Sequence, residues 1–166
     1  MDQNHVNVLV GAPLKNLNTP KKQLDDAIIA LKNLPNSEFM ACSQYYASKP
    51  MGPQDQPDYV NAVACINTSL QPEQLLDLTQ AIELEHGRVR KAERWGARTL
   101  DIDILLFGEQ VINTKRLTVP HYGLNEREFV VYPLQEIAPE LILPSGASIK
   151  QIANNLPLND LQQLPL

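Results

Sequence analysis

Two acids separated by a single residue provide the clearest chemical signal in the sequence. Asp101 and Asp103 lie in Thr99–Phe107, where isoleucines alternate with the acids. In a β-strand, residues i and i+2 point to the same side, so the two carboxylates project together, about 6.5–7 Å apart at their backbone positions. Such oxygen ligands suit Mg²⁺, whose coordination is usually completed by water and substrate phosphates. The alternative is a solvated strand face that carries two acids.

A basic segment directly precedes this strand. Five of the fourteen basic residues lie within positions 88–98, although the whole chain has a net charge of −5. Guanidinium groups bind phosphate oxygens in a bidentate manner, so cations here and acids just after them match the needs of a metal–nucleotide site. Trp95 lies in the same segment and is better placed to cover a ligand than to join a core. The alternative is a solvated basic loop or a nucleic-acid contact. The five basic residues are Arg88, Arg90, Lys91, Arg94 and Arg98.

Other polar residues are compatible with a ligand site but less specific. Gln80 and Glu83 lie about one helical turn apart, outside the apolar stripe of a predicted helix, and face either the same site or solvent. His121 and Tyr122 follow Pro120 in a turn. His121 could contact phosphate or be a structural histidine, and its spacing favours neither.

A flat heterocycle is a plausible second ligand. The side chain of Asn61 carries a donor and an acceptor in one plane, which suits the edge of such a ring. Tyr59 and Phe129 could supply aromatic faces for stacking. A proline-rich polar loop at 50–57 leads into this region. The alternative is a simple connection with a core tyrosine.

Composition excludes several classes of protein. The chain has 166 residues, 43% of them hydrophobic, and no apolar run approaches the length of a membrane helix. No secretory signal is visible, and the two cysteines form no CxxC pair, so we expect one cytoplasmic domain spanning 1–166 without a zinc site. The P-loop pattern GxxxxGK[ST] and the protein-kinase motifs are absent from the sequence.

The predicted elements have the order β-α-β-β-α-β, which is typical of an α+β, ferredoxin-like fold with an antiparallel sheet and helices on one face. An irregular C-terminal extension follows, with short helices around Glu126–Tyr132 and Ser148–Asn155. The predicted strands and helices are His5–Val10, Pro20 to about Pro35, Phe39–Ala47, Tyr59–Thr68, Pro72–Gly87 and Thr99–Phe107.

Three blocks of the sequence match one known family. Residues 94–108, RWGARTLDIDILLFG, closely resemble the signature of the 6-hydroxymethyl-7,8-dihydropterin pyrophosphokinases of folate biosynthesis. Residues 52–62 and 117–122 resemble the other conserved blocks of that family, in the same order and spacing. The similarity runs from about Thr19 to Ser145. Ala97 stands where many relatives have proline, Met51 replaces a common leucine, and the loop after Gly11 is atypical.

The resemblance implies a reaction and a site. Such enzymes transfer diphosphate from ATP to the hydroxymethyl group of 6-hydroxymethyl-7,8-dihydropterin and release AMP. The family pattern assigns two Mg²⁺ ions to Asp101 and Asp103, and it places Arg88, Trp95 and Arg98 on a loop that closes over ATP. It assigns the pterin to Ser48, Pro50, Met51, Tyr59, Asn61 and Phe129. It assigns ATP to Gln80, Glu83, Arg90, Trp95, Ile104, Arg116, Thr118, His121, Tyr122 and Arg127.

The expected mechanism is an in-line displacement at the β-phosphorus of ATP, with Arg88, Arg98, Asp101 and Asp103 as the catalytic set. The residues do not single out a general base, because an aspartate or a metal-bound water could accept the proton. Two alternatives are a non-catalytic nucleotide-binding module and an RNA-binding domain with a basic loop. The second is disfavoured by the acidic chain and its 5% aromatic content. We expect a monomer with small-molecule partners and without nucleic acid or membrane.

Overall fold

A four-stranded antiparallel sheet forms the centre of the computed structural model, in the order β3-β6-β1-β7. The structure describes residues 6–11, 14–15, 20–48, 59–87, 101–158 and 161–163. The predicted antiparallel sheet is therefore confirmed. Its strands are β1 (Val6–Gly11), β3 (Ser37–Cys42), β6 (Val63–Thr68) and β7 (Asp103–Phe107).

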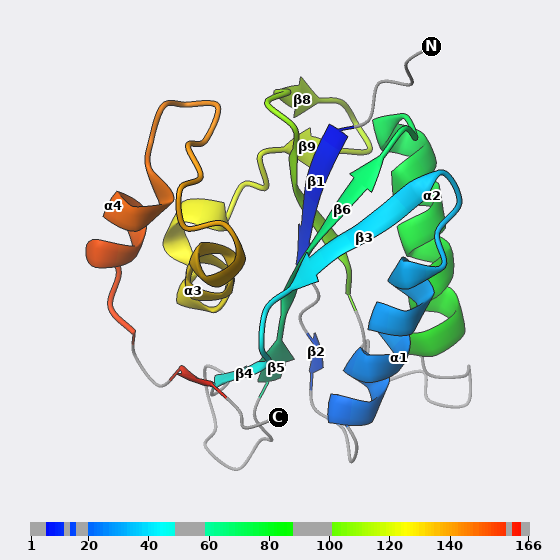
Figure 1. Ribbon diagram of the computed structural model, residues 1–166, viewed down its shortest axis with the longest axis horizontal. Coiled ribbons are helices and arrows are strands. Elements are labelled where there is room, and N and C mark those ends of the chain that lie inside the picture. Colours follow the sequence, from blue (N-terminus) through cyan, green and yellow to red (C-terminus); the bar gives the residue numbers. More distant parts are fainter. Residues whose placement is uncertain are drawn as a thin grey trace.

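Helices cover both sides of this sheet (Figure 1). The predicted helices α1 (Pro20–Lys32) and α2 (Pro72–Ile82) share one side. The C-terminal extension folds onto the other side through α3 (Glu128–Ile137) and α4 (Ile149–Asn154). The helices of the predicted βαββαβ unit thus lie on one face, and the extension adds a third layer.

Alternation along the strands separates two apolar cores. Val8 and Ile104 pack with α1 and α2, whereas Leu9, Val63 and Leu105 pack with α3 and α4. Successive residues of a strand point to opposite sides, so a strand covered on both sides becomes nearly continuously apolar. The predicted apolar stripe of the first helix is buried, and it consists of Leu24, Ala27, Ile28, Leu31 and Leu34.

Two segments predicted as continuous strands are each divided between two sheets. The segment predicted as Phe39–Ala47 forms β3 and then β4 (Tyr46–Ser48). The segment predicted as Tyr59–Thr68 forms β5 (Tyr59–Asn61) and then β6. The breaks lie at residues 43–45 and at Ala62. β4 and β5 belong to a second sheet, of order β10-β4-β5-β2, with β2 at Leu14–Lys15 and β10 at Gln162–Gln163.

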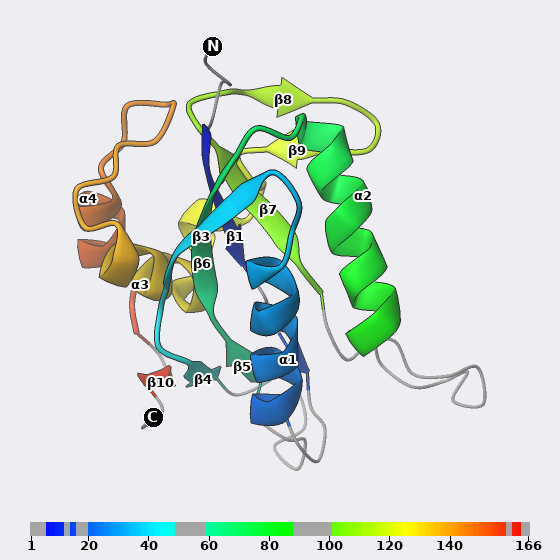
Figure 2. The ribbon, with the colours of Figure 1, turned by 45° about the vertical axis from the view of Figure 1, so that its right-hand side comes forward.

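Ser43 holds the two strand segments together where they leave the central sheet. Its backbone N–H donates to the Val63 carbonyl at 2.8 Å, and its hydroxyl accepts the Val63 N–H at 3.0 Å. A buried backbone donor without a partner is costly, and the hydroxyl supplies that partner. Figure 2 shows β4, β5 and β10 together at one end of the central sheet.

The other predicted boundaries differ in detail. α2 continues into a π-helical turn, η1 (Glu83–Gly87), and ends at Gly87 as expected. β7 begins at Asp103, whereas a start at Thr99 was predicted; residues 99–100 lie outside the described part. α3 extends to Ile137, five residues past its predicted end, although it contains Pro133.

A hairpin and a short turn connect the sheet to the extension. The hairpin consists of β8 (Ile112–Asn113) and β9 (Thr118–Val119). A cis peptide bond joins Val119 to Pro120, and the 3₁₀ turn η3 (Leu124–Glu126) leads into α3. In the described part of the chain, no helix is both long and apolar enough to cross a bilayer.

Candidate active site

The ends of three strands meet at one end of the central sheet. Gly11, the last residue of β1, lies opposite Val63 of β6 and opposite Asp103 of β7. Asn61 precedes Val63 by two residues, and Asp101 precedes Asp103 by two. The sheet register therefore brings the predicted pterin residue Asn61 and the predicted metal ligands to the same end of the sheet.

These side chains also share one side of the sheet. Ile102 and Ile104 are buried in the core of α1 and α2, so Asp101 and Asp103 emerge on the side of α3, as the alternation predicted. Asp101 precedes the regular strand β7, which begins at Asp103. Asn61 lies between Val60 and Ala62, which belong to the α1 and α2 core, so it also faces α3.

The environment of Asp103 is crowded with charge. Its Oδ2 lies 3.7 Å from Nε2 of His121. Burial raises the pKa of Asp103 above its usual range, and the negative charge of Asp101 acts in the same direction, while His121 and Arg127 oppose the rise. Burial also lowers the pKa of His121, against the effect of Asp103. A cation between the two carboxylates would relieve their repulsion.

Three residues after β9 form a stacked group beside Asp103. Nδ1 of His121 accepts the backbone N–H of Gly123 at 3.2 Å, which leaves Nε2 facing Asp103. The ring of Tyr122, which is 78% exposed, stacks on His121 at 4.6 Å between centroids. Cζ of Arg127 lies 5.3 Å from the Tyr122 ring centre and 5.9 Å from that of Phe129. Arg127 thus connects an aromatic ring of the predicted ATP set with one of the predicted pterin set.

Glu83 and Gln80 bind different partners. The Glu83 carboxylate accepts the backbone N–H of Ile102 at 2.6 Å, which fixes the segment between the two aspartates against η1. The exposed Gln80 accepts from Arg116 at 3.4 Å. Arg116 also lies 2.6 Å from Asp77, one turn earlier on α2. Gln80 thus contacts the β8–β9 hairpin, and Glu83 contacts the start of β7, so the two side chains bind neighbouring segments from one side of the helix.

The side-chain amide of Asn61 has an unusual environment. Asn61 is only 3% exposed, and no described residue accepts a hydrogen bond from its Nδ2. A buried donor without a partner costs free energy and normally signals a missing ligand, ion or water. Phe129 lies half-buried at the start of α3, on the same side of the sheet. A ligand with an acceptor on its edge would satisfy this amide.

The remaining predicted residues are only partly placed. The side chain of Ile104 is buried in the core, so only its backbone groups could contact a ligand, and Thr118 is exposed on β9. Ser48 and Tyr59 pair through their backbones in β4 and β5. The other predicted site residues lie outside the described part of the chain; they are Pro50, Met51, Arg88, Arg90, Trp95 and Arg98.

The carboxylate pair fits a magnesium site completed by substrate. Within the described ranges, no group of three or more histidine, cysteine, aspartate or glutamate side chains could hold a metal ion. Asp101 and Asp103 would offer two carboxylates to a metal ion, and water and phosphate would supply its other ligands. This donor set is typical of Mg²⁺ bound together with nucleotides.

Comparison with known proteins identifies the family. Residues 9–139 match the family described as 7,8-dihydro-6-hydroxymethylpterin-pyrophosphokinase. The chain belongs to this pyrophosphokinase family. A relative from Haemophilus influenzae, named 2-amino-4-hydroxy-6-hydroxymethyldihydropteridine pyrophosphokinase, is 56% identical over 137 residues, covering 82% of this chain and 85% of the relative. A protein of the same name from Pseudomonas aeruginosa is 49% identical over 150 residues, covering 90% and 92%.

Solved structures support the fold of the family. The wild-type HPPK-DHPS of Plasmodium falciparum matches with a TM-score of 0.73 at 11% identity, over 92% of this chain. This chain spans 45% of that longer polypeptide. The ferredoxin-like fold predicted from the sequence is thus confirmed. The family resemblance is confirmed as well, and a purely binding module is not favoured.

Two residues near the site were not predicted from the sequence. Ser43 joins the two sheets, and Glu136 of α3 accepts hydrogen bonds from the break between β3 and β4. Glu136 lies 92 positions from one donor, Gln44, and no local pattern indicates such a contact.

Proposed function

We propose that this pyrophosphokinase of folate biosynthesis binds 6-hydroxymethyl-7,8-dihydropterin at Asn61 and Phe129 and binds ATP with Mg²⁺ beside Asp101 and Asp103. One observation carries the assignment. A buried amide without a partner and a pair of repelling carboxylates lie at the same end of one sheet, on the same side. A flat polar ring would satisfy the first and a metal–phosphate group the second.

The pterin end supplies recognition. The Nδ2 group of Asn61 donates to an acceptor on the edge of the ring, where bulk water is excluded. Phe129 offers an aromatic face from α3, and the family pattern adds Tyr59 as the opposite face. Together these groups fix the plane of the ring and so the direction of its hydroxymethyl arm.

The nucleotide end supplies charge. Asp101 and Asp103 would hold the metal, and Mg²⁺ bound there neutralises phosphate oxygens and lowers the barrier to attack at phosphorus. Glu83 keeps these two residues in place through the Ile102 N–H. His121, Tyr122 and Arg127 form the neighbouring wall, and Arg116 adds a guanidinium from the β8–β9 hairpin. The proposed ATP set is completed by Gln80, Ile104, Thr118, Arg90 and Trp95.

The reaction is a displacement at the β-phosphorus of ATP. The hydroxymethyl oxygen loses its proton to an aspartate or a water at the site and forms a bond to that phosphorus. The bond to the oxygen shared with the α-phosphate breaks, so AMP leaves with those electrons. Reaction at the β- rather than the γ-phosphorus is a matter of alignment, which the two ends of the site impose together. Arg88 and Arg98 are proposed to stabilise the charge that develops on the phosphates.

An assay of AMP release tests the function directly. The full chain is incubated with ATP and Mg²⁺, with and without 6-hydroxymethyl-7,8-dihydropterin, and AMP is quantified by chromatography. We expect AMP only when the pterin is present, in a 1:1 ratio with pterin diphosphate. Binding of ATP without AMP formation would instead support a nucleotide-binding module. We further propose that the chain acts as a cytoplasmic monomer and requires Mg²⁺, which omission of the metal from the same assay tests.

Arg116→Ala is expected to raise the KM for ATP about tenfold and to leave the KM for the pterin unchanged, because one charge-assisted contact to phosphate is lost. Its bonds to Glu73 and Asp77 lie on the surface, where solvent screens ion pairs, so stability changes little. Steady-state kinetics with each substrate varied provide the measurement. Asp77→Ala is the control, since it breaks the same ion pair but keeps the guanidinium. Equal increases in the KM for ATP in both variants would contradict a direct role of Arg116.

A further inference from the structure

The pterin end of the site depends on the break between β3 and β4. There the chain passes from the central sheet into the second sheet, and Tyr46, the first residue of β4, lies directly opposite Asn61. Residues opposite each other in an antiparallel pair project to the same side. Tyr46 and Asn61 thus both face α3, and the position of Asn61 depends on how the break is held.

Glu136, in the last turn of α3, holds this break. Its carboxylate accepts the backbone N–H of Gln44 at 3.0 and 3.2 Å and the hydroxyl of Tyr46 at 2.6 Å. Gln44 lies between β3 and β4, so its N–H is outside the strand ladders. One carboxylate therefore supplies the partner of an irregular backbone donor and orients the side chain opposite Asn61.

The same helix carries Phe129 at its other end. Positions seven apart in an α-helix lie on the same face, two turns from each other. Phe129 and Glu136 therefore lie on the same face of α3, which is distinct from its fully buried face. The contacts of Glu136 with the break restrain the rotation of α3 together with the buried side chains of the helix, and a change in this rotation would move the Phe129 ring relative to Asn61.

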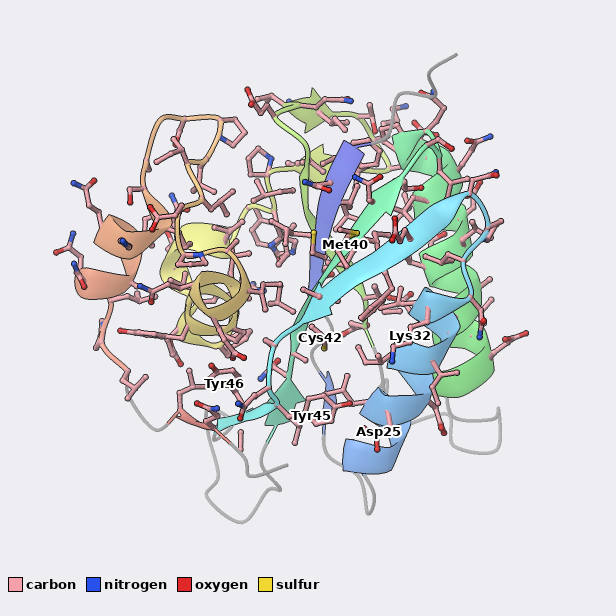
Figure 3. All side chains as sticks on the ribbon, in the orientation of Figure 1. Asp25, Lys32, Met40, Cys42, Tyr45 and Tyr46 are labelled. Atoms are coloured by element: carbon pink, nitrogen blue, oxygen red, sulfur yellow. The ribbon has the colours of Figure 1, made fainter. Side chains whose placement is uncertain are left out.

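The opposite side of the break is held separately. Tyr45 donates to Asp25 of α1 at 2.5 Å. Figure 3 shows Tyr45 on the side of Asp25 and α1, with Tyr46 on the other side of the chain. The break is thus fixed from both faces of the sheet, and of these two contacts the one with Glu136 belongs to the helix that carries Phe129.

We infer that Glu136 is a positioning residue for the pterin ring: it couples Asn61, through Gln44 and Tyr46, to the Phe129 end of α3. This inference rests on the proposed pterin role of Asn61 and Phe129. Glu136 itself lies on the wall of a pocket of about 460 Å³ next to Leu158 and Leu161, and it does not contact the reacting groups. Because its side chain is solvent-exposed, replacing it leaves no buried cavity.

The test compares Glu136→Ala with Glu136→Gln in the AMP assay. Misplacement of a group by about 1 Å can cost about 100-fold, so a smaller displacement in Glu136→Ala is expected to raise the KM for the pterin about tenfold, with the KM for ATP unchanged. Glu136→Gln keeps an acceptor oxygen and is expected to restore most of the wild-type KM. Glu140→Ala is the matched control, because Glu140 is an exposed acid three residues past α3 whose partner is Lys150.

A structural readout separates positioning from general destabilisation. Amide hydrogen exchange measured by NMR should show lost protection at Gln44 in Glu136→Ala, with the thermal midpoint close to that of the wild type. A pterin KM that stays unchanged while Gln44 loses protection would overturn the inference, as would equal increases in both KM values. If the wild-type chain itself releases no AMP, the proposed function fails. This outcome is seen without any variant, so it is distinct from a failure of the Glu136 inference.

Discussion

Asp103→Asn is expected to reduce AMP formation by about 10³-fold or more at saturating ATP, pterin and Mg²⁺. The substitution keeps the shape of the side chain but removes the negative charge that would hold the metal, and metal stabilisation of phosphoryl transfer is worth several kcal/mol. The measurement is single-turnover AMP release. Near-normal turnover would show that the metal assignment is wrong.

The stability of the same variant provides an independent check. Burial raises the pKa of Asp103 in the folded protein, so folding favours the neutral carboxyl. The ionised form therefore destabilises the fold increasingly as pH rises from the unfolded-state pKa to the folded-state pKa, and this cost persists at neutral pH. In metal-free buffer at pH 7, Asp103→Asn is expected to unfold at the same temperature as the wild type or higher.

Adding Mg²⁺ and an ATP analogue completes the test. These ligands should raise the unfolding temperature of the wild type by mass action and should have much less effect on Asp103→Asn. Glu140→Gln is a suitable control, because the Glu140 side chain is 84% exposed and its partner is Lys150, which is not one of the proposed site residues. If Asp103→Asn unfolds at a much lower temperature than the wild type without ligands, its inactivity would be due to misfolding and not to loss of the metal.

Asn61→Ala is expected to raise the KM for the pterin about 100-fold, with little change in the KM for ATP. The loss corresponds to two or three hydrogen bonds of about 1 kcal/mol each in a site shielded from water. Because the Asn61 Nδ2 has no partner in the described structure, its removal should not lower the thermal midpoint. Steady-state kinetics and thermal unfolding measure the two effects.

Asn67 provides a matched comparison in the same β-structure. It lies on β6, and its Nδ2 donates to Asn7 at 2.7 Å on the exposed surface. Asn67→Ala should lose about 1 kcal/mol of stability or less and should leave both KM values unchanged. The two asparagines thus predict opposite patterns. A fall in stability without a kinetic change at Asn61 would mean that its amide serves the fold and not the ligand.

The sequence predicted the local features well because they depend on local rules. The alternation of Ile102 and Ile104 with two acids indicated which side chains face the core, and burial in the structure agrees. The start of the first helix at Pro20 and the stop of the second at Gly87 follow from residues that cap or break helices. The family blocks indicated the reaction class, which the comparisons support.

The strand breaks could not be predicted in this way. The segments 39–47 and 59–68 have strand-like composition throughout, so nothing local marks residues 43–45 or Ala62. Whether a strand continues depends on which neighbour pairs with it, and these neighbours come from elsewhere in the chain. The break is in turn what places Tyr46 opposite Asn61.

Residue types, their alternation along the chain and three family blocks thus determined the chemistry and the class of fold from the sequence alone. Only the tertiary structure decided that Asn61 is buried without a partner, that Glu83 holds the Ile102 N–H, and that Glu136 holds the β3–β4 break. The physical reason is distance along the chain. Periodicity reports the side to which a residue points, whereas a hydrogen bond between residues tens of positions apart exists only after the layers have packed.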